Sequence, residues 1–198
     1  MRVSIEDIKK LKELSGIGLT DAKVALVDAG GDFDKALSEL RKKGLTKADK
    51  KGDREARAGL IDGYVHGGRI GVVLEVNCET DFVARTDNFK EFVHEIALQI
   101  ASMAPEYVSE SDIPAKELAR VRSEAEESVV ADGKPADIAK KIVEGQVKKH
   151  FADKVLLNQA YIKDEKQTVE DFLKENISKT GENIIIRRFS RLELGLGE

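Results

Sequence analysis

The sequence has 198 residues, of which 41% are apolar and 35% charged, a composition typical of a soluble globular protein with room for two or three modules. Its 33 basic and 37 acidic residues give a net charge of −4, so the protein as a whole does not attract nucleic acids or anionic membranes. Cys78 is the only cysteine, which excludes an internal disulfide and a metal site built on paired thiols.

Three short helices are predicted near the N-terminus, each from apolar residues at helical spacing. Ser4, Thr20 and Asp32 are side chains that can cap first turns, and Gly44 reads as a glycine cap at the end of the third helix. A bundle this small has a marginal core, so we expect it to present apolar surface to a partner. The predicted helices cover residues 4–15, 20–29 and 32–44 of a bundle that spans residues 1–45.

The loop between the first two helices carries Ile17 and Leu19, which cannot both be assigned to a helix face. They either fill the small core or form the exposed patch, and the pattern leaves both possibilities open. Residues 46–58 are charged and almost without apolar side chains, which predicts a linker or a solvated helix. A phosphate contact is the alternative, but the mixed signs of the charges weaken it.

The residues after 58 predict an α+β core. Apolar strands on either side of Gly67 and Gly68 predict a β-hairpin, and the helical repeat from Phe89 to Met103 predicts a helix that covers one face of it. The fold class is therefore α+β: an N-terminal three-helix bundle, a charged linker, and a core with a small antiparallel sheet over residues 59–198.

A helical hairpin is predicted within this core. Prolines at two expected first turns indicate helices over residues 114–131 and 135–158, which fold back on each other at the turn of Gly133 and Lys134. Because the first helix has few large apolar residues, we expect a protruding, largely solvated arm over residues 114–158. Thr168 can cap one more helix, and residues 184–194 predict a closing strand.

Enzymatic chemistry finds little support in the sequence. Cys78 ends an apolar strand, where a buried and inert thiol is the common outcome, and the three histidines stand at unrelated spacings. No phosphate-binding glycine loop, zinc-protease motif or paired cysteine spacing is present, so we expect no catalytic residue, cofactor or metal. No apolar run could span a bilayer, and the chain begins with an amphipathic helical pattern, so we expect a cytoplasmic protein without a membrane partner.

One segment stands out, because the strand that ends at Cys78 runs directly into a polar stretch holding a single aromatic residue, Phe82. Only 5% of the chain is aromatic, so this placement needs a reason. Periodicity alone favours a Phe82 that turns inward and joins the strand to the next helix, since most phenylalanines are buried. The alternative is an exposed contact residue.

Several motifs, in order along the chain, resemble those of bacterial elongation factor Ts. The resemblance covers essentially the whole length and is closest to the short form of that family, which has one core subdomain. The motifs are Leu14-Ser15-Gly16-Ile17-Gly18 with Asp21-Ala22-Lys23 and Ala25-Leu26, then Ile61-Asp62-Gly63, then Leu74-Glu75-Val76-Asn77-Cys78 leading to Thr80-Asp81-Phe82-Val83-Ala84, and finally Gly181-Glu182-Asn183 with Arg187-Arg188-Phe189.

The resemblance implies a guanine-nucleotide exchange factor for elongation factor Tu, the GTPase that delivers aminoacyl-tRNA to the ribosome. It implies that the N-terminal helices form a ubiquitin-associated-like bundle that docks on the GTPase. It also implies a homodimer, giving a two-plus-two complex with its seam near the C-terminal strand, and no direct nucleic-acid partner. The alternative function is a non-enzymatic scaffold or adaptor whose ubiquitin-associated-like bundle binds peptides.

Two groups of partner-binding residues follow from the resemblance. Asp81 and Phe82 match the pair that intrudes near the magnesium and phosphate site of the GTPase, and their turn opens the nucleotide site as a wedge. The loop before the second helix matches the family's docking loop. The implied residues are Thr80, Asp81, Phe82 and Val83 in the wedge, and Ile17, Gly18, Leu19 and Thr20 in the docking loop.

Overall fold

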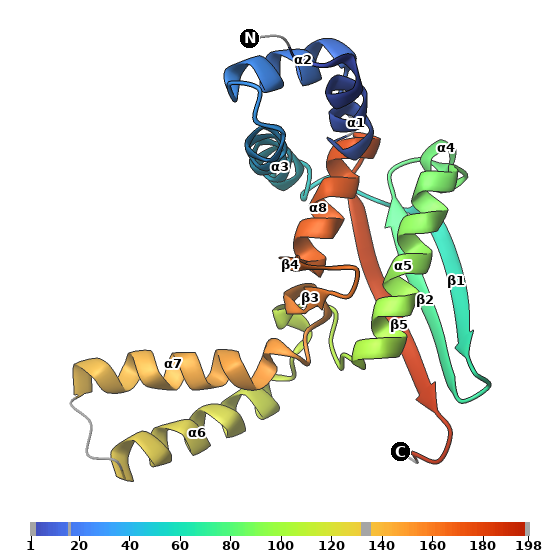
Figure 1. Cartoon of the computed structure of the whole chain (residues 1–198). Helices are drawn as coiled ribbons and strands as arrows, with labels where there is room; N and C mark the ends of the chain where they lie inside the picture. The colour runs from blue at the N-terminus through green and yellow to red at the C-terminus, as the bar shows by residue number, and fades with distance from the viewer. Residues whose placement is uncertain (1–2, 16, 132–135, 197–198) are drawn as a thin grey trace. The chain divides into compact units, whose positions relative to one another are not determined.

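The computed structural model describes residues 3–15, 17–131 and 136–196 and confirms an α+β protein (Figure 1). The chain forms two compact units. One comprises Met1–Ile61, Glu75–Val93 and Glu170–Ile186, and the other comprises Asp62–Leu74, His94–Val169 and Arg187–Glu198. Within the described residues, no helix is long and apolar enough to cross a membrane.

The three predicted N-terminal helices are present as α1 (Ile5–Ser15), α2 (Leu19–Asp28) and α3 (Phe33–Asp49). Two predicted caps are confirmed: the Asp7 amide donates to Ser4 Oγ at 2.9 Å, and the Lys35 amide donates to Asp32 Oδ1 at 3.0 Å. The helices enclose a small core, whose buried members are Leu11, Ala22, Leu26, Ala29 and Ala36. The likeness of this bundle to a ubiquitin-associated fold stays a prediction.

The predicted Thr20 cap is wrong, because α2 begins one residue earlier. Gly18 is the N-cap, in extended conformation, and its carbonyl accepts from the Ala22 amide at 2.9 Å without any side-chain cap. Thr20 therefore lies inside the first turn. The end of α2 follows the prediction, with Gly30 and Gly31 at φ of 71° and 86°, the left-handed region that favours glycine.

The predicted end of the third helix at Gly44 is also wrong. Helix α3 continues through Gly44 to Asp49, so residues 46–49 of the predicted linker are helical. A Cβ at Gly44 would lie 3.3 Å from Ser178 Oγ of helix α8 (Val169–Thr180), so the glycine permits close packing of two helices. Lys174 of α8 pairs with Asp49 at 2.9 Å. The division into 1–45, 46–58 and 59–198 stays a prediction.

The predicted hairpin and closing strand form one sheet, in which β1 (Ala58–His66), β2 (Ile70–Cys78) and β5 (Ile184–Glu193) stand in the order β1-β2-β5. Helix α5 (Asp87–Met103) lies against one face of this sheet, as predicted (Figure 1). The ring centroids of His94 on α5 and Tyr64 on β1 are 5.7 Å apart, with one ring edge-on to the other. Arg191 of β5 donates to the Ala101 carbonyl.

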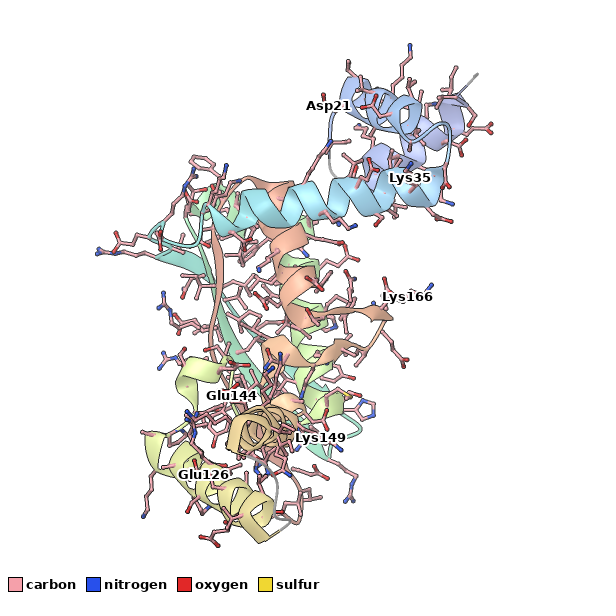
Figure 2. The ribbon with its side chains drawn as sticks, turned by 90° about the vertical axis from the view of Figure 1, so that its left-hand side faces the viewer. Asp21, Lys35, Glu126, Glu144, Lys149 and Lys166 are labelled. Atoms are coloured by element: carbon pink, nitrogen blue, oxygen red, sulfur yellow. The ribbon has the colours of Figure 1, made fainter. Side chains whose placement is uncertain are left out.

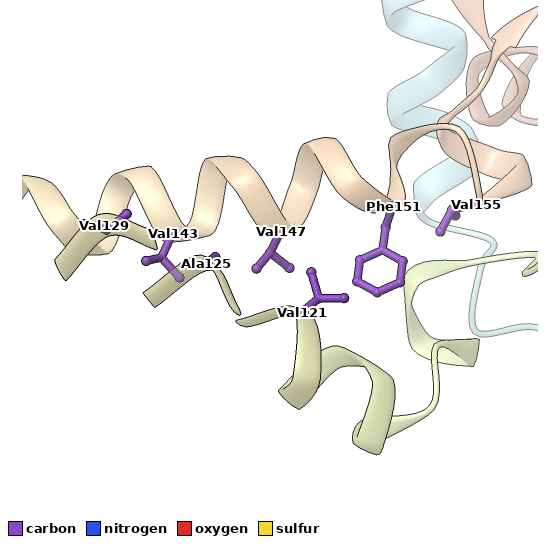
Figure 3. Packing of buried hydrophobic residues seen from close by; sticks show 7 residues of the cluster. All are labelled: Val121, Ala125, Val129, Val143, Val147, Phe151 and Val155. Carbon is purple, nitrogen blue, oxygen red and sulfur yellow. The ribbon is translucent and has the colours of Figure 1, made fainter. Parts of the chain in front are cut away.

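The arm consists of α6 (Ala115–Ala131) and α7 (Ala136–Ala152), which pack on each other as predicted. Their turn at Gly133 and Lys134 lies outside the described residues. Most described residues of the arm are exposed, as expected, and the facing sides of the two helices form a continuous apolar seam that needs only small residues on α6 (Figure 3). The seam consists of Val121, Ala125, Val129, Val143, Val147, Phe151 and Val155.

The chain between the arm and α8 differs from the prediction. Helix α7 stops at Ala152, and a second antiparallel pair of strands follows, β3 (Ala160–Tyr161) and β4 (Asp164–Thr168). The fully buried Gln99 of α5 fixes this pair by donating to the Ala160 carbonyl and accepting from the Ile162 amide. A single glutamine thus supplies hydrogen-bond partners for the backbone of this strand pair, which the sequence pattern does not reveal.

Candidate partner-binding site

The wedge residues 80–83 form a tight structure at the end of β2. Thr80 is the N-cap of a single turn of helix, α4 (Asp81–Ala84), and its Oγ1 accepts from the Val83 amide at 3.4 Å. Ala84 is 8% exposed and anchors the turn, while Val83 is half-buried. The four residues are therefore brought together as one element.

Phe82 points outward, with 80% of its surface exposed. The inward orientation that periodicity favours is wrong, because α4 is a helical turn and not a continuation of the strand, so the alternation of faces stops at Cys78. An exposed phenylalanine on an ordered turn leaves its apolar surface in water. The turn thus presents a large apolar side chain to solvent.

Asp81 is exposed next to Phe82 and forms an ion pair with Arg85 at 2.9 Å. Both side chains are more than half exposed, and such pairs contribute roughly 0–1 kcal/mol. The ion pair therefore holds the Asp81 carboxylate only weakly. The turn presents an apolar group and a negative charge side by side.

The loop after α8 is hydrogen-bonded to the wedge turn, a contact that the sequence pattern did not predict. The Glu182 carboxylate accepts from the Thr80 amide at 3.0 Å and from Thr80 Oγ1 at 2.6 Å. Its neighbour Asn183 donates its amide N–H to Glu79 Oε1 at 2.6 Å. The resemblance motif of Gly181, Glu182 and Asn183 was the available signal, but nothing in spacing alone joins it to residues a hundred positions earlier.

Cys78 is fully buried beneath the turn, and its Sγ donates to the Thr80 carbonyl at 3.1 Å. Burial, followed by the negative charge of Glu182, raises the pKa of the thiol to about 11. Two of the histidines have other partners, since His66 bonds Tyr64 at 2.8 Å and His94 pairs with Asp62. A protonated, enclosed thiol is a structural residue and not a nucleophile.

The docking loop is divided between the two interpretations left open above. Ile17 is half-buried and packs against the bundle core, whereas Gly18, Leu19 and Thr20 are exposed. Leu19 is 50% exposed and is followed on α2 by two more half-exposed apolar residues that the sequence analysis did not single out. These are Val24 and Val27.

Leu19, Val24 and Val27 share one helix face, since steps of 100° per residue place them within about 140° of one another. Charged side chains of both signs surround the described parts of the bundle and the arm (Figure 2). Asp21 and Lys35 lie on the bundle, and Glu126, Glu144 and Lys149 lie on the arm. Each of these two parts therefore carries charges of mixed sign. No group of three or more metal-binding side chains occurs among the residues that the structure describes.

Comparison with known proteins decides the family. The family model described as elongation factor TS matches residues 47–196. The elongation factor Ts of Thermoanaerobacter sp. strain X514 is 50% identical over 196 residues, covering 98% of this chain and 96% of the relative. That of Coprothermobacter proteolyticus is also 50% identical, covering 98% of this chain and all of the relative. This chain belongs to the elongation factor Ts family.

Membership in the elongation factor Ts family confirms the resemblance drawn from the motifs and gives the chain a role in translation elongation. The relatives extend through the N-terminal bundle, which the family model itself does not cover. The elongation factor Ts of Herpetosiphon aurantiacus, 46% identical, likewise covers 98% of this chain and 99% of its own length. The bundle and the core therefore belong to one family architecture.

Proposed function

We propose that this chain binds elongation factor Tu in the cytoplasm and promotes release of GDP without covalent chemistry. The observation that carries the proposal is the exposed Phe82 on a fixed turn, next to the Asp81 carboxylate, in a chain of this family. An apolar and an acidic side chain at the tip of one turn can enter a nucleotide site and compete with the contacts that hold magnesium and phosphate.

The proposed mechanism is a difference in binding affinity. An exchange factor that binds the nucleotide-free GTPase more tightly than the GDP-bound form must weaken GDP binding by the same factor. No general base or nucleophile is needed. The buried and protonated Cys78 fits this scheme, because the turn above it acts by its shape and charge.

The free energy from burying Phe82 alone is too small to release a tightly bound nucleotide. Burial of a phenylalanine side chain contributes about 1.5–3 kcal/mol, which is roughly one to two decades in an equilibrium constant. A tightly held nucleotide requires a larger shift. We therefore assign the remaining affinity to the docking loop, through Leu19 and the exposed face of α2, and to contacts of the core.

The proposed homodimer uses the outer face of the sheet. Val73 stands between two buried residues of β2, so alternation places it on the face opposite α5. Val65 and Leu192 are 70% and 74% exposed, and unpaired apolar faces of this kind mark interaction surfaces. Leu192→Glu places a charge on this face, so light scattering should show a dimer for the native chain and a monomer for the variant. A monomeric native chain at working concentration would contradict the dimer.

Release of fluorescent GDP from purified elongation factor Tu tests the function. Addition of the chain should accelerate release in proportion to its concentration until the GTPase is saturated. The scaffold alternative, in which the bundle only binds peptides, predicts capture of the GTPase or of another protein with no change in the release rate. Acceleration therefore supports exchange, and binding without acceleration refutes it.

A further inference from the structure

The wedge turn is fastened to a distant part of the chain by one carboxylate. Glu182 accepts two hydrogen bonds from the same residue, one from the Thr80 amide at 3.0 Å and one from the Thr80 hydroxyl at 2.6 Å. Bonds to an ionised carboxylate are about twice as strong as bonds between neutral groups. The first residue of the turn is thus held in both its backbone and its side chain.

Glu182 is itself held in place. Gly181 has φ of 78°, a conformation that glycine adopts readily, and the Glu182 amide donates to Thr180 Oγ1 at 3.3 Å. On the other side, the Asn183 side chain donates to the carbonyls of Gly52 at 3.3 Å and Arg54 at 2.7 Å. The carboxylate therefore projects from a loop that is anchored on both flanks.

The turn cannot hold its own shape. A helix of four residues forms too few bonds to offset the cost of its nucleation. Its N-terminal side-chain cap, Thr80 Oγ1, is the same atom that donates to the Glu182 carboxylate. Loss of the carboxylate would release the cap and the backbone at the point from which Phe82 projects, two residues later.

We propose that Glu182 is a positioning residue, which holds Thr80 so that the turn presents Phe82 and Asp81 in the conformation that enters the GTPase. This inference rests on the proposed exchange function. Glu182 acts through Thr80 and need not touch the partner. Its loss affects the step in which the bound factor opens the nucleotide site more than it affects the initial docking.

The kinetic test separates these two steps. Glu182→Ala should lower the maximal rate of GDP release at saturating factor on the order of tenfold, the effect of losing one or two charge-assisted hydrogen bonds. The half-saturating concentration should stay within about twofold. Glu182→Gln keeps one acceptor oxygen and should recover part of the rate. Glu126→Ala, at an exposed glutamate of the arm, is the control and should behave as the native chain.

The variant Thr80→Val tests whether Glu182 and Thr80 act together, because valine removes the hydroxyl while keeping the shape of the side chain. If Glu182 acts through Thr80, the double variant should be about as slow as Glu182→Ala alone. Independent, multiplying losses would overturn the proposal. So would an unchanged maximal rate in Glu182→Ala, or a loss confined to the half-saturating concentration.

A measurement on the free protein tests the positioning role of Glu182 independently of the exchange function. Hydrogen exchange at the Val83 and Ala84 amides, which bond Thr80 Oγ1 and the Thr80 carbonyl, should accelerate in Glu182→Ala but not in Glu126→Ala. Unchanged protection overturns the positioning role even if the native chain releases GDP. Faster exchange supports the role even if the native chain does not.

Discussion

Replacement of Phe82 by alanine should separate stability from function. Phe82 is 80% exposed, so only about a fifth of the 1.5–3 kcal/mol available from its full burial supports the fold, or about 0.3–0.6 kcal/mol. The melting temperature should then fall by about 1–2 °C. The remaining 1.2–2.4 kcal/mol becomes available only in the complex, which corresponds to about 8- to 60-fold in rate or affinity.

The proposed wedge predicts where that loss occurs. If Phe82 is buried only as the nucleotide site opens, Phe82→Ala should lower the maximal GDP-release rate by this factor and leave the half-saturating concentration nearly unchanged. Stopped-flow release of fluorescent GDP at several factor concentrations measures both quantities. Val130→Ala is a matched control, since Val130 is 78% exposed on the arm. A normal maximal rate for Phe82→Ala would refute the wedge.

Four further substitutions probe other parts of the structure. Leu19→Ala should raise the half-saturating concentration severalfold with little effect on the maximal rate, because it weakens docking; the opposite pattern would refute the docking loop. Gly59→Ala should cost on the order of 3 kcal/mol of unfolding free energy, because its φ is 143° and its Cβ would lie 2.1 Å from the Val76 carbonyl oxygen. Gly68→Ala, with open space around it, should cost about 1 kcal/mol in the same denaturation series. Cys78, with its pKa raised to about 11 from 9.0, should alkylate about a hundredfold more slowly at pH 8 than in unfolded protein, and Cys78→Ser should exchange normally.

The helices and strands could be predicted largely because their patterns are local. The helical repeat from Phe89 to Met103 and the glycine turn at 67 and 68 each contain their own evidence, and both are confirmed. Gly44 shows the limit of such reasoning. A glycine after a run of helical residues has the same local pattern whether it ends a helix or admits a neighbour, and only Ser178, far along the chain, decides between the two.

The candidate site shows the same limit. Periodicity predicts an inward Phe82 because it treats the residue as a continuation of the strand that ends at Cys78. Only the family resemblance predicts an exposed side chain. The hydrogen bonds between Thr80 and Glu182 join positions 102 residues apart, which no local pattern can encode. The short pair β3 and β4 was missed for a related reason, since its partner is the buried Gln99 on another element.

The proposed mechanism requires that this chain binds nucleotide-free elongation factor Tu more tightly than the GDP-bound form. Titration calorimetry or fluorescence can give its dissociation constant for the nucleotide-free and the GDP-bound GTPase. The same experiments give the GDP dissociation constant with and without the factor. The mechanism predicts tighter binding of the chain to the nucleotide-free form, and an affinity for GDP that falls by the same ratio when the chain is bound. Equal affinity for the two forms would contradict it.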